Sequence, residues 1–273
     1  MILCQITDTH IEADRKLAYG IVDTAAFLER CVADILTLPQ RPDVVIATGD
    51  LVDWGRPDEY GLLRELLSPL TMPLYLMPGN HDERASMRNS FPGHAYLRQW
   101  EPFIQYAIDE FPLRLVALDS LVPKQGGGTL CGERLAWLAR TLAERPEAPT
   151  IVALHHPPFT TGIGHMDKVA LDAASVAGLA EVVSRHPQVE RVIAGHLHRP
   201  ITARFAGTVA STCPSPAHQV ALDLAPDAKD DYILEPPAYQ LHWWNGAQLI
   251  THTAYVGTFP GPYPFRVGGK LID

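Results

Sequence analysis

Five short segments in the first 200 residues carry side chains that can bind metal ions. They are Asp8-Thr9-His10, Gly49-Asp50-Leu51-Val52-Asp53, Gly79-Asn80-His81-Asp82, His155-His156-Pro157-Pro158 and Gly195-His196-Leu197-His198. Carboxylate, imidazole and amide ligands without thiolates suit Fe, Mn, Zn or Co, and they do not suit Cu(I) or an iron–sulfur cluster. The residue types therefore predict a metal site assembled from several parts of the chain.

The spacing inside two of these segments predicts cooperating ligands. Asp8 and His10 are two positions apart, as are His196 and His198. In extended backbone such residues point to the same side, where they can hold one metal ion or two neighbouring ions. Glycines precede three of the key residues, and a residue without a Cβ lets the backbone turn sharply and approach the site closely.

Each segment taken alone has an ordinary structural explanation. A lone Asp-x-His is usually a cap or a surface turn, and a single buried His is usually satisfied by a carbonyl group. Asn80 could cap a short helix over residues 82–90, and His155 to Pro158 could form a rigid loop. The conjunction of five such segments, each at the end of an apolar run, favours one shared site.

Short apolar runs and amphipathic segments alternate through the first two thirds of the chain. The apolar runs are typical of buried strands and cover residues 2–6, 44–47, 74–77, 113–118, 150–154 and 191–194. The amphipathic segments are typical of covering helices and comprise residues 24–36, 58–67, 133–143 and 171–185. This alternation predicts a layered α/β fold, with ligand residues at the carboxyl ends of the strands.

The pattern changes after Pro200, where strand-like runs follow one another without helices. They cover residues 201–206, 219–222, 239–244 and 248–254. The charged stretch 225–237 is more typical of a plain surface loop than of the edge of a lid. The run 126–128 is typical of a flexible glycine turn. The aromatic residues 243–244 and 263–265 favour core packing ahead of a cap over the site or a subunit interface.

Composition excludes several classes of protein. With 273 residues, of which 47% are hydrophobic, the chain can bury a sizeable core. Its net charge of −9 offers no basic surface for a nucleic acid polymer. No apolar run approaches the ~20 residues of a membrane span, and no signal-peptide pattern stands at the N-terminus. The four scattered cysteines favour free thiols, so we expect a reducing, cytoplasmic location.

The five segments and their order along the chain resemble the motifs of the calcineurin-like binuclear metallophosphoesterases. Written as motifs, they are D-x-H, G-D-x-x-D, G-N-H-D, H-H-P-P and G-H-x-H. The sequences Gly55–Tyr60 and Pro73–Tyr75 narrow the resemblance to bacterial class III cyclic-nucleotide phosphodiesterases and glycerophosphodiesterases. The resemblance implies a four-layer α/β/β/α sandwich with a small C-terminal β-rich extension. Residues 1–200 would be the catalytic core, and residues 201–273 would complete it and contribute a cap or an oligomer contact.

The resemblance also implies two metal ions and their ligands. One ion would be held by Asp8, His10 and His198, the other by Asn80, His155 and His196, with Asp50 bridging them. The catalytic residues would be Asp50, Asn80 and His81, and the substrate contacts would be Asn80, His81 and His198. His156, Asp53 and Asp82 are expected to support these residues, and His218 and Gln219 have a weaker claim as neighbours of the substrate.

The implied reaction is hydrolysis of a small phosphodiester, a 3′,5′-cyclic nucleotide or a glycerophosphodiester, to a monoester and an alcohol, with metal-activated water as the nucleophile. A phosphomonoesterase is the alternative within the superfamily. It is disfavoured because the motifs contain no arginine to clamp a dianion, although Arg56 and Arg199 lie just outside them. A catalytically silent metal-binding interaction protein is the alternative from another class, and the complete ligand set disfavours it. Related phosphodiesterases form dimers or larger assemblies, so we expect a homo-oligomer.

Overall fold

The computed structural model describes residues 1–271 and contains two central β-sheets. The first sheet has five strands in the order β13-β12-β1-β2-β3. Its parallel strands are β1 (Ile2–Ile6), β2 (Val44–Thr48) and β3 (Leu74–Met77), which the apolar runs predicted. Strands β12 (Ala238–Trp244) and β13 (Leu249–Tyr255) extend this sheet in antiparallel orientation beyond β1.

The second sheet has six strands in the order β4-β5-β6-β7-β9-β8. Its strands are β4 (Tyr106–Ile108), β5 (Arg114–Ala117), β6 (Thr150–Ala153), β7 (Val189–Ala194), β8 (Thr202–Phe205) and β9 (Thr208–Thr212). The four central strands are parallel, and the edge strands β4 and β8 are antiparallel to their neighbours. Strand β9 was not predicted because its sequence, Thr-Val-Ala-Ser-Thr, is no apolar run.

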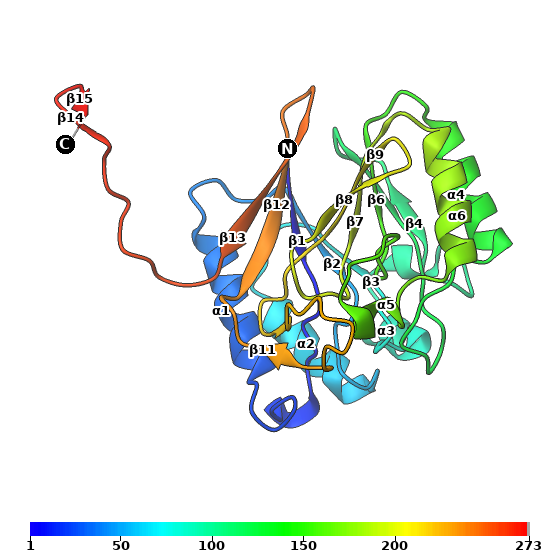
Figure 1. Cartoon of the computed structure of the whole chain (residues 1–273), viewed down its shortest axis with the longest axis horizontal. Helices are drawn as coiled ribbons and strands as arrows, with labels where there is room; N and C mark the ends of the chain where they lie inside the picture. Colours follow the sequence, from blue (N-terminus) through cyan, green and yellow to red (C-terminus); the bar gives the residue numbers. More distant parts are fainter. Residues whose placement is uncertain (272–273) are drawn as a thin grey trace.

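Helices cover the outer faces of the two sheets, so the predicted layered α/β fold is confirmed (Figure 1). Helices α1 (Thr24–Thr37) and α2 (Pro57–Leu67) lie on the side of the first sheet, and α4 (Gly132–Glu144) and α6 (Ala173–Ser184) lie on the side of the second. The shorter helices are α3 (Arg84–Ser90) and α5 (Gly164–Asp167), with 3-10 turns at Ala13–Arg15 and Ala95–Arg98. No helix among the described residues is long and apolar enough to cross a membrane.

One apolar core fills the space between the layers. Every residue of β1, β2, β5 and β6 is buried, because these strands are covered by a helix layer on one face and by the opposite sheet on the other. This two-sided burial explains why the strands are continuous apolar runs and do not alternate with polar residues. The close packing holds the carboxyl ends of both sheets at fixed positions.

The chain beyond residue 200 contributes strands to both sheets. Strands β8 and β9 belong to the second sheet, and β12 pairs with β1 in the first. Two small hairpins remain outside the sheets: β10 (Gln219–Val220) with β11 (Tyr232–Ile233), and β14 (Arg266–Val267) with β15 (Lys270–Leu271). The segment that carries β14 and β15 extends away from the body, at the red end of the chain in Figure 1.

Candidate metal centre

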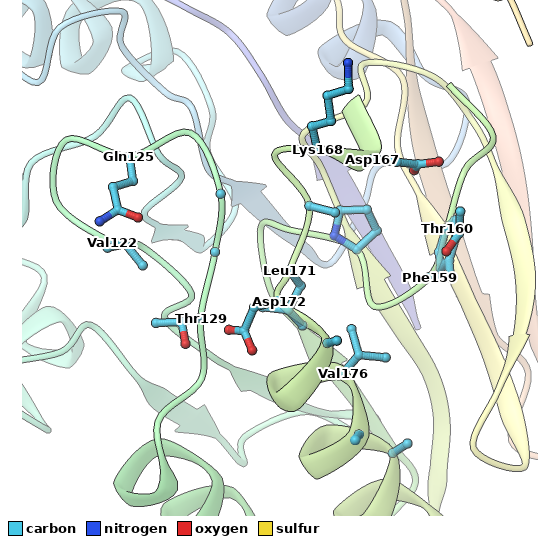
Figure 2. A pocket seen from close by; sticks show the side chains of 17 residues that line it. Val122, Gln125, Thr129, Phe159, Thr160, Asp167, Lys168, Leu171, Asp172 and Val176 are labelled. Atoms are coloured by element: carbon cyan, nitrogen blue, oxygen red, sulfur yellow. The ribbon is translucent and has the colours of Figure 1, made fainter. Parts of the chain in front are cut away.

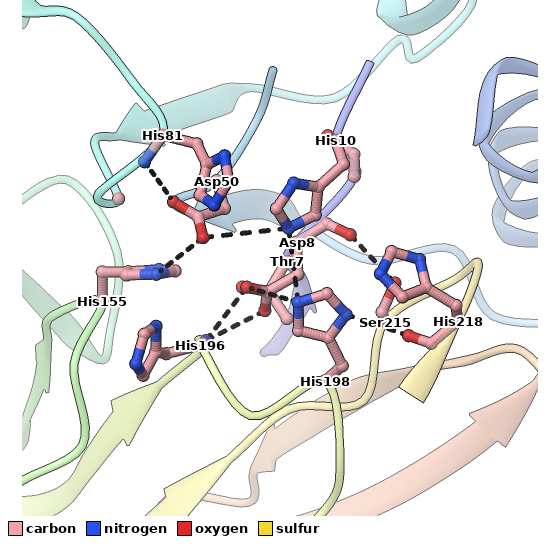
Figure 3. A network of polar contacts seen from close by, with 12 residues as sticks. Thr7, Asp8, His10, Asp50, His81, His155, His196, His198, Ser215 and His218 are labelled. Carbon is pink, nitrogen blue, oxygen red and sulfur yellow. Dashed lines mark hydrogen bonds and ion pairs between the residues drawn. The ribbon is translucent and has the colours of Figure 1, made fainter. Parts of the chain in front are cut away.

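The five predicted segments meet at the carboxyl ends of strands from both sheets (Figure 3). Asp8 and His10 follow β1, Asp50 follows β2 and Asn80 follows β3. From the second sheet, His155 follows β6, and His196 and His198 follow β7. The seven residues implied as metal ligands are therefore brought to one place, and all except the half-buried Asn80 are buried.

Asp8, His10 and His198 form one group of potential ligands, whose donor atoms lie within 4.8 Å of one another. His198 Nε2 is 3.3 Å from His10 Nε2 and 3.5 Å from Asp8 Oδ1. All three side chains come from loops that leave strand ends, and their donor atoms face a common point.

Asp50 joins this first group to a second. Its Oδ2 is 3.8 Å from His10 Nε2 and 3.2 Å from His155 Nε2. The same His155 nitrogen lies 3.2 Å from Asn80 Oδ1, and the His155 and His196 rings are 5.2 Å apart. Asp50 thus stands between two sets of donors, which is where a bridging carboxylate must lie.

The hydrogen bonds on the far side of each imidazole determine which nitrogen faces the centre. His155 Nδ1 lies 2.9 Å from Thr48 O, His198 Nδ1 3.0 Å from His218 O, and His196 Nε2 3.0 Å from Val169 O. Because a carbonyl oxygen only accepts, each of these nitrogens carries the hydrogen. In a neutral ring the other nitrogen then presents a lone pair to the centre.

His10 is oriented by a carboxylate in the same manner. Its Nδ1 donates to Asp53 Oδ1 at 3.0 Å. Burial opposes the charge on Asp53, but the hydrogen bond from His10 and the charges of His10 and His81 together outweigh it and lower the pKa of Asp53. His10 Nε2 and His198 Nε2 therefore face each other across 3.3 Å, close enough to share a proton or a metal ion.

Burial also sets the charge state of the donors. It lowers the pKa of His196 to about 3 and that of His198 well below its ordinary value, so both rings are neutral ligands at physiological pH. Burial opposes the charge on Asp50, but the adjacent His155 and His81 outweigh it and hold its pKa well below the usual range. Burial opposes the charge on His155 as well, but Asp50 and Asp8 outweigh it and raise its pKa to about 9, and the neighbouring carboxylates also raise the pKa of His10. A metal ion bound here would displace the protons of these two rings.

Five of these residues have left-handed backbone conformations. The φ angles are 53° at Asp8, 43° at His10, 49° at Asp50, 69° at His196 and 53° at His198. The expectation that the Asp-x-His and His-x-His pairs lie in extended backbone is therefore wrong, because each strand ends before its pair begins. Left-handed conformations of residues other than glycine are strained, and they concentrate at functional sites.

His156 has no nitrogen available for a metal ion, although it lies in one group with His155 and His196. Its Nε2 donates to Gly126 O at 3.0 Å, and its Nδ1 accepts from the Ser120 hydroxyl at 2.8 Å. The ring also packs so closely against Gly128 that a Cβ there would lie 2.6 Å from the imidazole Cγ. The glycine run expected to be a flexible turn is thus held in place by His156.

His81 stands at the edge of the centre, with its backbone N–H donating to Asp50 Oδ1 at 2.9 Å. Its Nδ1 donates to Asp53 O at 2.8 Å, and Nε2 has no hydrogen-bond partner within residues 1–271. The alternative that Asn80 caps the following helix is wrong, because the Glu83 side chain caps α3 by accepting from Ala85 N and Ser86 N. Asp82 accepts from the backbone of Gly79 and Leu51, so it supports the loop.

A cavity of about 450 Å³ opens over the donor groups. His218, expected as a neighbour of the substrate, lines this cavity together with Tyr19 and Tyr232. The three rings pack together, with Tyr19 and Tyr232 stacked at 4.7 Å. Tyr19 and Tyr232 were not predicted because neither belongs to a motif. Asp230 to Tyr232 also line the cavity, so the stretch expected as a plain surface loop reaches the site through β11.

A larger cavity of about 780 Å³ lies beside the centre (Figure 2). In Figure 2 the loop with Val122, Gln125 and Thr129 forms one wall, and Phe159 and Thr160 lie opposite. None of the seven implied ligands lines this cavity. Size alone therefore does not identify the reactive site.

The calcineurin-like phosphoesterase family model matches residues 1–200. The match includes all five segments and every implied ligand. The chain therefore belongs to the calcineurin-like phosphoesterase family.

Full-length relatives carry more specific names. The chain is 40% identical to the "Probable glycerophosphodiester phosphodiesterase GpdQ" of Arcobacter nitrofigilis, with 100% of both chains covered. It is 33% identical to glycerophosphodiester phosphodiesterase GpdQ of Enterobacter lignolyticus, over 96% of this chain and 94% of that protein. A cAMP/cGMP dual specificity phosphodiesterase of Mycobacterium tuberculosis is 34% identical, over 82% of this chain and 70% of that protein.

The fold also matches solved structures. A dimetal phosphatase from Danio rerio superposes with a TM-score of 0.68 at 16% identity, covering 94% of this chain and 98% of that one. At this identity the likeness concerns the fold alone.

Gly79→Ala should damage the centre directly. A Cβ at Gly79 would collide with Asp50 Oδ1 and lie 2.8 Å from His155 Cε1, so it would displace two donors. We expect metal affinity to fall by about 10- to 100-fold, as when supporting contacts of metal ligands are lost. Isothermal titration with Mn²⁺ or Zn²⁺ measures the change.

The matched control is Gly61→Ala in α2, where nothing lies within 4 Å of the added Cβ. That variant should bind metal normally and gain up to about 1 kcal/mol of helix stability. Equal metal affinity in the two variants would contradict the proposed crowding at Gly79.

Proposed function

We propose that this protein is a metal-dependent hydrolase of small phosphodiesters that holds two metal ions. The observation that carries the proposal is the convergence of four imidazoles, the Asp8 carboxylate and the Asn80 amide around the Asp50 carboxylate. The names of these relatives support the substrate class, a glycerophosphodiester or a cyclic nucleotide.

Asp8, His10 and His198 would hold one ion, and Asn80, His155 and His196 would hold the other, with Asp50 shared. The hydrogen-bonding described above directs His196 to bind through Nδ1 and the other three histidines through Nε2. Such a pair of ions supplies charge for the phosphoryl oxygens and lowers the pKa of water. The donor set fits Fe, Mn, Zn or Co, and it does not select among them.

His81 is placed to deliver a proton to the departing alcohol. Asp53 O occupies Nδ1, and the Asp53 carboxylate lies 3.6 Å from the same nitrogen. An imidazolium at this position keeps one proton on Nδ1 and presents the other at Nε2, the ring nitrogen without a protein partner. Asn80, His81 and His198 border the same cavity and would contact the substrate.

The phosphomonoesterase alternative is weakened by the positions of the two arginines outside the motifs. Arg199 donates to Glu235 Oε2 at 2.6 Å and to Val220 O, and it does not line the cavity over the donor groups. Arg56 lies over the Trp54 ring at 5.7 Å. Neither guanidinium is placed to clamp the extra charge of a monoester, which favours diesters.

A single activity panel tests the function. Protein reconstituted with Mn²⁺, Zn²⁺, Co²⁺ or Fe²⁺ is assayed on a glycerophosphodiester, a 3′,5′-cyclic nucleotide, an aryl diester and an aryl monoester. We expect kcat/KM to be higher for the diesters than for the monoester, and we expect chelation to abolish the activity reversibly. A clear preference for the monoester contradicts the proposal, and metal binding without any hydrolysis supports the silent interaction protein.

His81→Ala should separate proton delivery from metal binding. We expect kcat for a glycerophosphodiester to fall by about 10²- to 10⁴-fold, with metal content unchanged. The loss should be smaller for a p-nitrophenyl ester, whose leaving group needs no proton. Asp50→Ala is the comparison variant and should lose at least one ion by elemental analysis. If His81→Ala instead loses metal and keeps its activity per bound metal, the assigned role is wrong.

We also propose that residues 257–271 form an arm that contacts another copy of the chain. The arm leaves the body after the buried Val256, and its aromatic residues Phe259, Tyr263 and Phe265 are exposed, Phe265 to 87%. Exposed apolar groups of this size favour a protein partner.

The reducing cytoplasm stays a prediction, consistent with four free cysteines, of which three are buried.

Light scattering on the full chain and on a chain that ends at Val256 tests the arm. We expect the full chain to be a dimer or larger, and the shorter chain to keep its circular dichroism spectrum but lose mass per particle. Equal masses for the two chains would show that the arm is not the contact, and a monomeric full chain would contradict the oligomer.

A further inference from the structure

A second cavity of about 710 Å³ continues from the metal centre on the side of His81. It shares Asn80, His81 and Gly126 with the cavity over the donor groups, so the two form one cleft. Its outer walls are Trp54 on one side and residues 121–126 on the other. A diester bound with its phosphorus atom at the metal centre must place one of its two organic groups here or toward the opposite end of the cleft.

The charged groups of this second cavity are all paired, with one exception. Arg84 contacts both oxygens of Asp119, at 2.6 and 2.7 Å. The Glu83 carboxylate caps α3, and the Asp82 carboxylate accepts hydrogen bonds from backbone N–H groups. The Asp53 carboxylate accepts a hydrogen bond from His10 Nδ1. Lys124 is exposed and makes no ion pair with any carboxylate in residues 1–271.

The backbone holds Lys124 in an uncommon conformation. Its φ is 64°, in the left-handed region that glycine adopts without strain, although three glycines follow only two residues later. Arg84 donates to Leu121 O at 2.7 Å, and His156 donates to Gly126 O at 3.0 Å. The loop is therefore tied down on both sides of Lys124, and strain maintained in this way is typical of functional positions.

Two exposed carboxylates stand at the opposite end of the cleft. Asp230 and Asp231 line the cavity over the donor groups, next to Tyr19 and Tyr232. Carboxylates there repel an anionic group of the substrate, whereas Lys124 attracts such a group. Lys124 stands across the second cavity from Trp54, which is 62% exposed. The protein as a whole carries a net charge of −9, so this unpaired cation beside the centre is not a consequence of a basic surface.

We propose that the cavity between Trp54 and Lys124 binds one organic group of the diester and that Lys124 selects groups that carry their own negative charge, such as a carboxylate or a second phosphate. This inference rests on the proposed phosphodiesterase function. Lys124 is then a specificity-determining residue, and the chemistry at the phosphorus atom does not depend on it.

Three p-nitrophenyl phosphodiesters test the selection, because they share one chromogenic leaving group. The second alcohol is glycolate (anionic), ethanol (neutral) or choline (cationic). Lys124→Gln should lower kcat/KM for the glycolate ester by about fivefold, the effect of one solvent-exposed ion pair, and leave that for the ethyl ester unchanged. Lys124→Glu should reverse the preference between the glycolate and choline esters. Arg140→Gln, which removes one positive charge from an exposed position of α4, is the control.

The outcomes separate this inference from the function on which it rests. If the wild-type protein hydrolyses none of the esters, the proposed function fails. If it hydrolyses all three but Lys124→Gln affects them equally, Lys124 contacts the phosphate and does not select the organic group, so the inference is overturned. A change that Arg140→Gln reproduces would also overturn it, because the effect would then come from net charge.

Discussion

The convergence of buried donor atoms around Asp50 is the constraint on which the rest of the structure depends. Two imidazole nitrogens face each other across 3.3 Å, and the carboxylates of Asp8 and Asp50 lie among further imidazoles, away from water. Such a cluster is unfavourable without cations, because buried charges and lone pairs require partners. The two packed sheets and the carbonyl groups behind the rings keep the donors from turning apart. Metal binding and folding stability are therefore coupled.

The backbone at the strand ends shows how this arrangement is maintained. Five of the donor residues have φ angles between 43° and 69°, each in a strained left-handed conformation. Close contacts fix the remaining freedom: a Cβ at Gly195 would lie 2.9 Å from Asp8 Oδ2 and 3.1 Å from Thr48 O. The strain is local, whereas the stabilisation comes from the apolar core between the sheets. The rigid fold is thus needed chiefly to hold the strained backbone turns that carry the donor residues.

Features that depend on residue type and local order could be predicted from the sequence. Features that depend on which residues the fold brings together could not. The strand β3 was predicted at its observed bounds, since a buried parallel strand is a continuous apolar run. The seven residues implied as ligands could be singled out because their side chains are chemically distinctive, and the fold brings them to one place. Tyr19 and Tyr232 were missed because only the fold stacks them, and β9 was missed because its small polar residues are typical of a loop. The left-handed turns were missed because an alternating pair of ligands suggests extended backbone.

Substrate choice must also arise outside the five motifs that could be recognised from the sequence. The metal ions that the donor groups would hold can contact only the phosphoryl oxygens, which every phosphodiester shares, so the metal centre cannot distinguish one diester from another. Discrimination requires contacts with the organic groups, and these contacts lie on loops outside the five motifs. In this chain the loops are asymmetric: Asp230 and Asp231 border one end of the cleft, and Lys124 borders the other. Relatives with the same donor residues can therefore differ in substrate through loop charges alone, and similarity of the metal centre supports the reaction class more firmly than the substrate.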